Sequence, residues 1–245
     1  MRRIDAKKIN CKELNKLIYQ TVSLGEDSIT LNNVMGQRYI GAALSNNVNI
    51  TINGIPGNDL AVYMDGPTIT VNSNGQDGIG NTMNAGKIII NGDVGDILGH
   101  SMRGGKIYIK GDTGYRTGIH MKSYKESYPV IVIGGNTGDF LGEYIAGGVI
   151  IVLGLDKREN GSAVGNYIGT GMHGGTIYIR SEVKEYQLGK EVMITELNQE
   201  DMLTLRNYLS EYCRVFSLDL DKIIREDFVK LIPHNNRPYK EIYAY

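Results

Sequence analysis

The chain has 245 residues, a formal net charge of −1 at pH 7 and 32 glycines, which is nearly twice the usual share of glycine. The near-zero charge argues against nucleic acid as a main partner, because phosphate binding needs clustered Lys and Arg. The chain has no apolar run near the ~20 residues of a membrane span, and no apolar signal-peptide stretch follows the first residues. Cys11 and Cys213 lie far apart without a CxxC motif, so we expect no disulfide scaffold or iron–sulfur site and predict a cytoplasmic protein with reduced thiols.

The first predicted element is a helix in the stretch NCKELNKLIYQTV. Asn10 and Glu13 stand in a capping-box pattern at its start. The apolar side chains that share one face of this helix are Leu14, Leu17, Ile18 and Val22. We therefore predict an N-terminal helical cap over residues 1–28.

A repeat follows, and each of its units contains one apolar residue that serves as a marker. The markers are Leu44, Met64, Met83, Met102, Met121, Ile145 and Met172. Successive methionines from Met64 to Met121 are 19 residues apart, and the two longer steps contain the insertions 122–129 and 156–163. This regularity gives seven units between about Met35 and Arg180, and a period of this length is typical of a solenoid.

Two kinds of column within the unit predict its structure. Three residues before the marker the side chain is always tiny, at Gly41, Ala61, Gly80, Gly99, Gly118, Gly142 and Gly169. We predict that this column marks a corner of the coil, where a branched side chain would collide with the coil above or below and the glycines serve as structural turn residues. After the marker, β-branched residues alternate with a period of two, which indicates a short strand. Units of this size cannot bury an apolar face alone but can do so when stacked. We therefore predict an all-β fold, a single-stranded right-handed parallel β-helix of about seven coils over residues 29–181, in which each coil advances the axis by about 4.8 Å.

The middle position of each predicted strand does not fit a solvent-facing column. It contains Thr51, Thr70, Ile89, Tyr108, Ile131, Ile151 and Tyr178, of which five are large and apolar. A stripe of this kind needs a cover. The cover is either the C-terminal segment of the same chain or a partner protein, and the sequence does not decide between them. The candidate interface residues are Ile89, Tyr108, Ile131, Ile151 and Tyr178.

Residues 182–245 are predicted to form C-terminal helices and an extended tail. In the stretch 198–216 one helical stripe carries Met202, Leu205, Leu209, Tyr212 and Phe216. A second helix is predicted over 217–231 with Ser217 as its N-cap, followed by an extended tail over 232–245. We expect helices to cap the apolar core at both ends of the β-helix.

Three patterns suggest chemistry, and each has a structural alternative that we favour. The glycine-rich stretch GIGNTMNAG lacks the strand, loop and helix context of a phosphate-binding loop, so its glycines are assigned to turns. His100, His120 and His173 stand at different places in the repeat and do not predict a metal site. Asp77 and Asp96 could form a carboxylate pair on adjacent coils, for Ca²⁺ or acid–base catalysis, but an Asp column that binds turn N–H groups is favoured.

Several long stretches resemble one family in the right order. They are NVMGQRYIGAAL, PGNDLAVYMDGP, QDGIGNTMNAGKI, SMRGGKIYIKGDTGYRTGIHMK and PVIVIGGNTGDFLGEYIAGGVIIVLGL, with RPYKEIY near the end of the chain. These stretches resemble the GXGXG domain of glutamate synthase, the C-terminal β-helix of its large subunit. The resemblance covers roughly residues 29–181 and here concerns a stand-alone chain.

The resemblance implies a structural role. In that family the large subunit also has a glutamine amidotransferase domain with an N-terminal cysteine nucleophile, and a synthase domain that binds FMN and a 3Fe-4S cluster. The β-helix holds these domains in register around an ammonia tunnel and has no catalytic residue. Cys11 is not in a nucleophile context, so the amidotransferase role does not transfer to it.

The resulting expectation is a non-catalytic scaffold subunit of a glutamate synthase complex, which makes two glutamates from glutamine, 2-oxoglutarate and reductant. No catalytic, cofactor-binding or metal-binding residue is assigned, and FMN and 3Fe-4S are expected in a partner synthase chain. The expected partners are amidotransferase and FMN-synthase chains. In isolation the chain could form a homo-oligomer. Neither nucleic acid nor a membrane is expected as a partner. The alternatives are a β-helix subunit similar to the C subunit of formylmethanofuran dehydrogenase, and a stand-alone carbohydrate-active β-helix.

Overall fold

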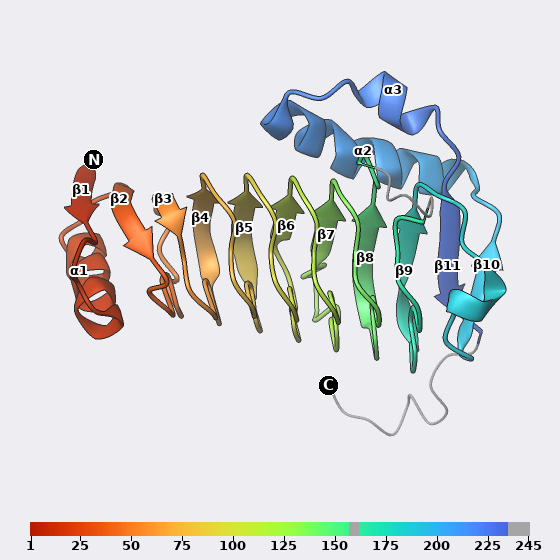
Figure 1. Ribbon diagram of the computed structural model, residues 1–245, viewed down its shortest axis with the longest axis horizontal. Coiled ribbons are helices and arrows are strands. Elements are labelled where there is room, and N and C mark those ends of the chain that lie inside the picture. The colour runs from red at the N-terminus through yellow and green to blue at the C-terminus, as the bar shows by residue number, and fades with distance from the viewer. Residues whose placement is uncertain (157–161, 235–245) are drawn as a thin grey trace.

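A computed structural model describes residues 1–156 and 162–234 of the chain (Figure 1). The described residues form an 11-stranded sheet in the order β1-β2-β3-β4-β5-β6-β7-β8-β9-β11-β10. Neighbouring strands from β1 to β9 are parallel, and most of the chain is a single stack of coils. The predicted all-β parallel β-helix is therefore confirmed.

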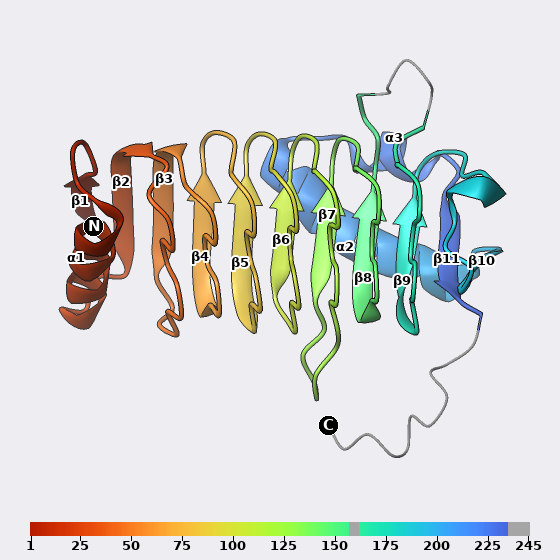
Figure 2. The same cartoon turned by 60° about the horizontal axis from the view of Figure 1, so that its bottom comes forward.

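The parallel strands follow one another in chain order across the stack. They are β1 (Arg2–Asp5), β2 (Ser28–Met35), β3 (Asn49–Ile55), β4 (Asp65–Val71), β5 (Ala85–Ile90), β6 (Lys106–Ile109), β7 (Val130–Ile133), β8 (Ala146–Val152) and β9 (Gly174–Ile179). The insertion 122–129 lies between β6 and β7 and projects from the stack (Figure 2). Residues 157–161 of the second insertion lie outside the described part of the chain.

The core consists of side-chain ladders that run from coil to coil. Ile69 pairs with Ile88, and Ile88 pairs with Ile107, at the same inward position of successive strands. The marker methionines Met64 and Met83 are also fully buried. Because each coil buries the apolar side of the coil next to it, the stack forms one continuous apolar interior.

The predicted register is wrong at β7. Ile131 pairs with Ile107 on one side and with Ile150 on the other, so it belongs to the interior ladder. Val130 and Val132 face outward instead. A shift of one residue moves every side chain of a strand to the opposite face, and the sequence VIVI offers no polar residue that would reveal the shift.

The N-terminal end is capped as predicted. Helix α1 (Cys11–Ser23) begins after Asn10, whose side chain accepts a hydrogen bond from the Glu13 N–H at 3.0 Å. Leu14 and Ile18 of α1 are buried in the same core as the coils. The segment before α1 adds β1 to the sheet, so the N-terminal region contributes a strand as well as a helix.

The C-terminal end of the sheet is closed by strands. After the 3₁₀ turn η1 (Glu185–Gln187) come β10 (Val192–Thr195) and, later in the chain, β11 (Val229–Pro233). β11 lies between β9 and β10 and pairs antiparallel with both. The helix predicted over 217–231 is correct only for Leu220–Ile224, and residues 229–231 of that stretch form a strand because they fill the open edge beside β9.

The two C-terminal helices lie along the side of the sheet. Helix α2 (Gln199–Phe216) crosses the strands from β9 toward β6, and helix α3 (Leu220–Ile224) is only a short segment above it (Figures 1 and 2). Ser217 ends α2 in a left-handed conformation with φ of 56°, and Asp219 caps α3 in place of the predicted Ser217. The expected extended tail falls mostly on residues 235–245, which lie outside the described part of the chain.

Within the described residues, no helix combines the length and the apolar character that crossing a membrane requires.

Candidate functional site: the corner face of the solenoid

At each corner of the solenoid, residues in the left-handed region of backbone conformation alternate with residues outside it. Residues five, three and one before the marker have positive φ, while the residues between them do not. Before Met83 these are Gly78, Gly80 and Thr82, with φ of 71°, 69° and 52°. Because glycine adopts this conformation without strain, the alternation explains corner glycines such as Gly78 and Gly80.

The middle position of the three must be small for a second reason. A Cβ on Gly80 would lie 2.5 Å from Cδ1 of Ile107 in the next coil, and one on Gly118 would lie 2.4 Å from Cδ1 of Ile150. Both distances are far below van der Waals contact. At this column the coils therefore leave no room for a Cβ atom.

The corner amides are not available to bind a phosphate. The N–H of Gly78 donates to the carbonyl of Asp96 at 3.0 Å, and the N–H of Thr82 donates to the carbonyl of His100 at 2.7 Å. The N–H of Gly80 donates in the opposite direction, to Leu60 at 2.9 Å. Since these donors already bond to neighbouring coils, the glycine-rich stretch is an architectural element.

The column of aspartates also stabilises the backbone. Oδ1 of Asp77 accepts from the N–H of Asp96 at 2.9 Å, and Oδ1 of Asp96 accepts from the N–H of Tyr115 at 2.8 Å. Asp139 accepts from the N–H of Asn166 in the same way. These oxygens hold the next coil in register, as the turn interpretation of this column predicts.

The histidines do not converge on a metal site. The rings of His100 and His120 are 6.0 Å apart, while His173 contacts the carbonyl of Gly171 through Nδ1 at 3.0 Å. Burial and the neighbouring His120 both lower the pKa of His100. Across residues 1–156 and 162–234, no group of three or more His, Cys, Asp or Glu side chains could hold a metal ion.

The candidate interface column on the outer face of the sheet is covered by the chain itself. Tyr108 and Ile151 are fully buried and Tyr178 nearly so, in a cluster with Leu205 and Leu209 of α2. The C-terminal segment is thus the cover over this part of the sheet. The remaining predicted interface residues lie elsewhere: Ile89 is half-buried at the margin of this cluster and Ile131 is in the interior.

Two carboxylates fix α2 to the sheet. Glu211 accepts hydrogen bonds from the Tyr108 hydroxyl at 2.8 Å and from Nζ of Lys106 at 2.6 Å, and it also pairs with Lys87. Burial acts to raise the pKa of Glu211, but the hydrogen bonds from both lysines and from Tyr108 outweigh it and lower the pKa to about 2. Burial and the hydrogen bond to Glu211 raise the pKa of Tyr108.

The second carboxylate lies in the first turn of α2. Asp201 accepts from the Tyr178 hydroxyl at 2.6 Å and from Nζ of Lys230 at 2.8 Å. It also closes a capping box with Asn198, whose N–H donates to it at 2.8 Å. Each of these anchors joins a tyrosine of the sheet to a carboxylate of α2, so the buried polar groups hold the helix in one position on the apolar face.

The structure brings together a group of residues that the sequence did not single out. Large side chains occupy corner positions with positive φ, and they contact one another from coil to coil. We call this group the corner cluster: Arg116, His120, Phe140, Glu143, Tyr144 and Tyr167. All except Glu143 have φ between 53° and 62°.

Ring stacking makes the corner cluster rigid. The Phe140 and Tyr167 rings stack at 4.9 Å and 15°, and the Arg116 guanidinium lies 4.9 Å from the centre of the Phe140 ring. His120 stacks on Tyr144 at 5.2 Å and 9°. Nε of Arg116 also donates to the Glu143 carboxylate at 2.8 Å, which neutralises both charges.

The cluster is nevertheless open to solvent. The side chains of Tyr144 and Tyr167 are 45% and 54% exposed. A large residue in the left-handed region costs about 1 kcal/mol, so this surface is maintained against a local strain. Rigid, exposed aromatic rings are the side chains that protein interfaces favour. The available sequence signal was the run of large residues five positions and one position before the marker in successive units.

The solved structures include a chain with the same fold. It belongs to the crystal structure of the formyltransferase/hydrolase complex (FhcABCD) from Methylorubrum extorquens in complex with methylofuran. The match has a TM-score of 0.63 at 23% identity and covers 91% of this chain and 87% of that chain. At this level of identity the likeness shows a shared fold.

A curated relative is much more similar in sequence. The uncharacterized protein MJ1350 of Methanocaldococcus jannaschii is 46% identical over 249 residues, which cover 98% of this chain and 95% of the relative. The model of the family described as GXGXG motif matches residues 25–236. That range includes the left-handed corners, their glycines and the strands between them, and the chain therefore belongs to the GXGXG motif family.

Proposed function

We propose that the protein is a non-catalytic scaffold subunit of a glutamate synthase complex. Such a complex converts glutamine, 2-oxoglutarate and reductant into two glutamates. The partners would be an amidotransferase chain and a synthase chain, and FMN and 3Fe-4S would belong to the synthase chain. Membership of the GXGXG motif family and the resemblance of five long stretches to the glutamate synthase domain support this assignment.

The corner cluster is the observation that carries the scaffold role. Arg116, Phe140 and Tyr167 come from three successive coils and form one continuous stack, in which Phe140 is half-buried between the exposed Arg116 and Tyr167. Their backbone strain and their rigidity have no evident benefit for the isolated chain. A partner that packs against them would gain contact area at little cost in side-chain entropy, because the rings are already ordered.

The solenoid suits this role physically. Corner amides, strands and Asp side chains of the turn column bond to neighbouring coils, so surfaces several coils apart keep a fixed distance. Transfer of ammonia between two catalytic chains requires that their sites stay in register. A rigid body that binds both chains supplies that constraint without taking part in the chemistry.

A second candidate is a scaffold subunit of a formyltransferase/hydrolase type of complex. The structural likeness to a chain of the Methylorubrum extorquens complex favours it, since it covers most of both chains. Both candidates give the corner cluster the same role and differ in the enzymes that are bound. A stand-alone carbohydrate-active β-helix has less support, because Asp77 and Asp96 are engaged by backbone N–H groups.

Affinity purification of the tagged protein from its native cells, followed by mass spectrometry, tests the proposal. We expect amidotransferase and FMN-synthase chains in the eluate together with glutamine-dependent glutamate formation. Formyltransferase and hydrolase chains would favour the second candidate. Recovery of this chain without catalytic chains would contradict both.

Variants locate the interface. Tyr144→Gly with Tyr167→Gly removes two exposed rings at positions where glycine is the least strained residue, so the fold should persist. We expect this double variant to lose the catalytic chains. Tyr186→Ala is the matched control, because Tyr186 is 72% exposed on η1 and outside the corner cluster.

A further inference from the structure

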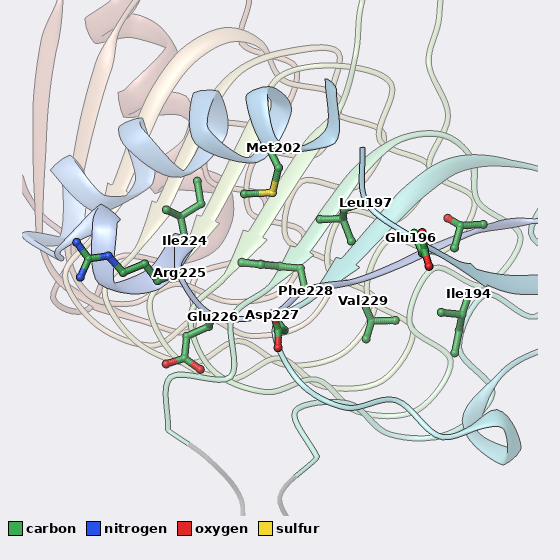
Figure 3. A pocket seen from close by; sticks show the side chains of 11 residues that line it. Ile194, Glu196, Leu197, Met202, Ile224, Arg225, Glu226, Asp227, Phe228 and Val229 are labelled. Atoms are coloured by element: carbon green, nitrogen blue, oxygen red, sulfur yellow. The ribbon is translucent and has the colours of Figure 1, made fainter. Parts of the chain in front are cut away.

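A groove lies at the C-terminal end of the sheet, away from the corner cluster. It encloses about 620 Å³ between β10, the start of α2 and the segment that joins α3 to β11. Figure 3 shows Met202 from α2, Ile224 from α3 and Phe228 around the same space. We call it the C-terminal groove: residues 194–197, Met202 and residues 224–229. Its volume is in the range that accommodates a large side chain or a small ligand.

The groove borders the last strand of the sheet. Among the described residues β10 pairs only with β11, so its other side is an edge. The N–H and C=O groups on such an edge can pair with an added strand. Ile194 is 44% exposed on this strand, and Oγ1 of Thr195 is buried without a hydrogen-bond partner among the described residues. The edge therefore offers backbone groups and an apolar side chain.

The charge around the groove is one-sided. Glu196, Glu226 and Asp227 line it and are exposed, against the single basic residue Arg225. The wider region 182–234 has eleven acidic and seven basic residues. Neighbouring like charges favour a basic partner, because opposite charges increase both the rate and the specificity of docking.

We propose that the C-terminal groove binds an extended basic segment of a partner protein chain. The segment adds a strand to the free edge of β10 and inserts one apolar side chain between Met202 and Phe228. Its Lys or Arg residues lie against Glu196, Glu226 and Asp227. This inference rests on the proposed scaffold function and assigns the C-terminal end to one catalytic chain, while the corner cluster binds another surface.

A peptide probe tests the chemistry directly. The fluorescein-labelled peptide KVRFKVK, which alternates basic and apolar residues, is titrated with the full-length protein and followed by fluorescence anisotropy. We expect it to bind about tenfold or more tightly than EVEFEVE, which reverses the charges, and than KVRGKVK, which lacks the aromatic anchor. Equal binding of the three peptides would overturn the proposal.

Charge reversal on the protein locates the site. Glu226→Lys with Asp227→Lys should weaken KVRFKVK about tenfold and flatten its salt dependence. Glu126→Lys with Glu182→Lys is the matched control, since both residues are exposed and neither lines the groove. An equal effect of the two double variants would mean that the peptide follows net charge only, and the proposal would fail.

Two further experiments test whether the groove is occupied by another part of the same chain or by a second copy of it. A chain that stops at residue 234 and binds KVRFKVK tenfold more tightly than the full chain would identify residues 235–245 as the occupant, and would overturn the proposal. The molar mass is also measured by light scattering. A molar mass that rises with protein concentration, and that is lower in Arg2→Glu with Arg3→Glu than in the wild type, would identify a second copy of the chain as the occupant. That result would also overturn the proposal.

The native purification distinguishes this inference from the scaffold function. If the wild-type chain recovers catalytic chains and Glu226→Lys with Asp227→Lys recovers them equally, the groove is not a docking site although the scaffold function stands. If the wild-type chain recovers none, the scaffold function fails regardless of the peptide result. We expect the double variant to lose one catalytic chain and retain the other.

Discussion

The Cδ1 atom of Ile131 lies 2.5 Å from the point at which a Cβ atom on Gly99 would stand. Gly99 belongs to the corner before β6 and Ile131 to the interior ladder of β7, so the contact joins successive coils. Gly99 also has φ of 66°. The position therefore excludes a side chain for two independent reasons, crowding and backbone conformation.

Gly99→Val should destabilise the fold strongly. Overpacking costs about 1–3 kcal/mol, and a β-branched residue in the left-handed region costs about 1–2 kcal/mol more. We expect the free energy of unfolding to fall by about 3 kcal/mol, measured by thermal and urea denaturation. Gly25→Ala is the control, because φ of Gly25 is 85° and nothing lies within 4 Å of the added Cβ. A Gly99→Val melting temperature within a degree or two of wild type would contradict the corner assignment.

Glu211→Gln should loosen α2. The neutral amide keeps the shape of the side chain but loses the charge that Lys87 and Lys106 compensate. Hydrogen bonds to a charged group contribute about 1.5–3 kcal/mol, and the partial exposure of both lysines lowers the expected loss to about 1–2 kcal/mol. Urea unfolding followed by circular dichroism measures it.

A double-mutant cycle with Tyr108→Phe shows whether this contact is specific. Because Tyr108 and Glu211 share a hydrogen bond of 2.8 Å, their effects should not add. Glu200→Gln, an exposed residue on the same helix, should change stability by less than about 0.5 kcal/mol. Additive effects of Tyr108→Phe and Glu211→Gln would show that the contact between these two side chains does not hold α2 on the sheet.

Acid should detach α2 before the coils unfold. The pKa of Glu211 is about 2 in the folded chain against an ordinary 4.5, so its ionised form stabilises the fold. That contribution is complete above pH 4.5 and is lost as the pH falls toward 2. The lowered pKa of Asp201 acts in the same direction. Amide exchange should therefore speed up in α2 between these pH values while the amides of β4 and β5 stay protected.

The Glu211→Gln variant provides the comparison for this acid transition. It lacks the titrating carboxylate, so the part of the transition due to Glu211 should disappear and that due to Asp201 should remain. An acid transition of unchanged size in the variant would show that other groups control α2.

Tyr167→Gly should leave stability nearly unchanged. The lost stack on Phe140 contributes about 1 kcal/mol, and the relief of the left-handed backbone at Tyr167, where φ is 59°, returns about 1 kcal/mol. Tyr167→Val, which loses the stack and keeps the strain, should instead lose about 1 kcal/mol. The two variants are compared by urea denaturation, and equal destabilisation would show that the corner carries no strain.

The periodic part of this fold was predictable from the sequence alone. The 19-residue spacing of Met64, Met83, Met102 and Met121, with a tiny residue three positions earlier, predicts stacked coils and crowded corners. The Asn10 cap of α1 was equally evident. These features depend on contacts that repeat at a fixed separation or within one helical turn, so the order of residues carries them.

Other features depended on contacts between segments that no local pattern relates. The stretch VIVI of β7 is apolar on both faces, and only pairing with β6 and β8 places Ile131 inside. Residues 229–233 form a strand because an open sheet edge was available beside β9. The cover on Tyr108 and Tyr178 was left undecided, and the carboxylates of α2 that bond their hydroxyls decided it.

The candidate site belongs to this second group. In the sequence, Phe140, Tyr144 and Tyr167 are ordinary residues scattered among glycines. Their positive φ and their stacking arise only when successive coils align, because the rings come from different turns of the solenoid. The sequence by itself thus determined the repeating coil. The tertiary structure decided which surfaces are closed by the chain and which remain open, since covering a surface requires two distant segments to meet.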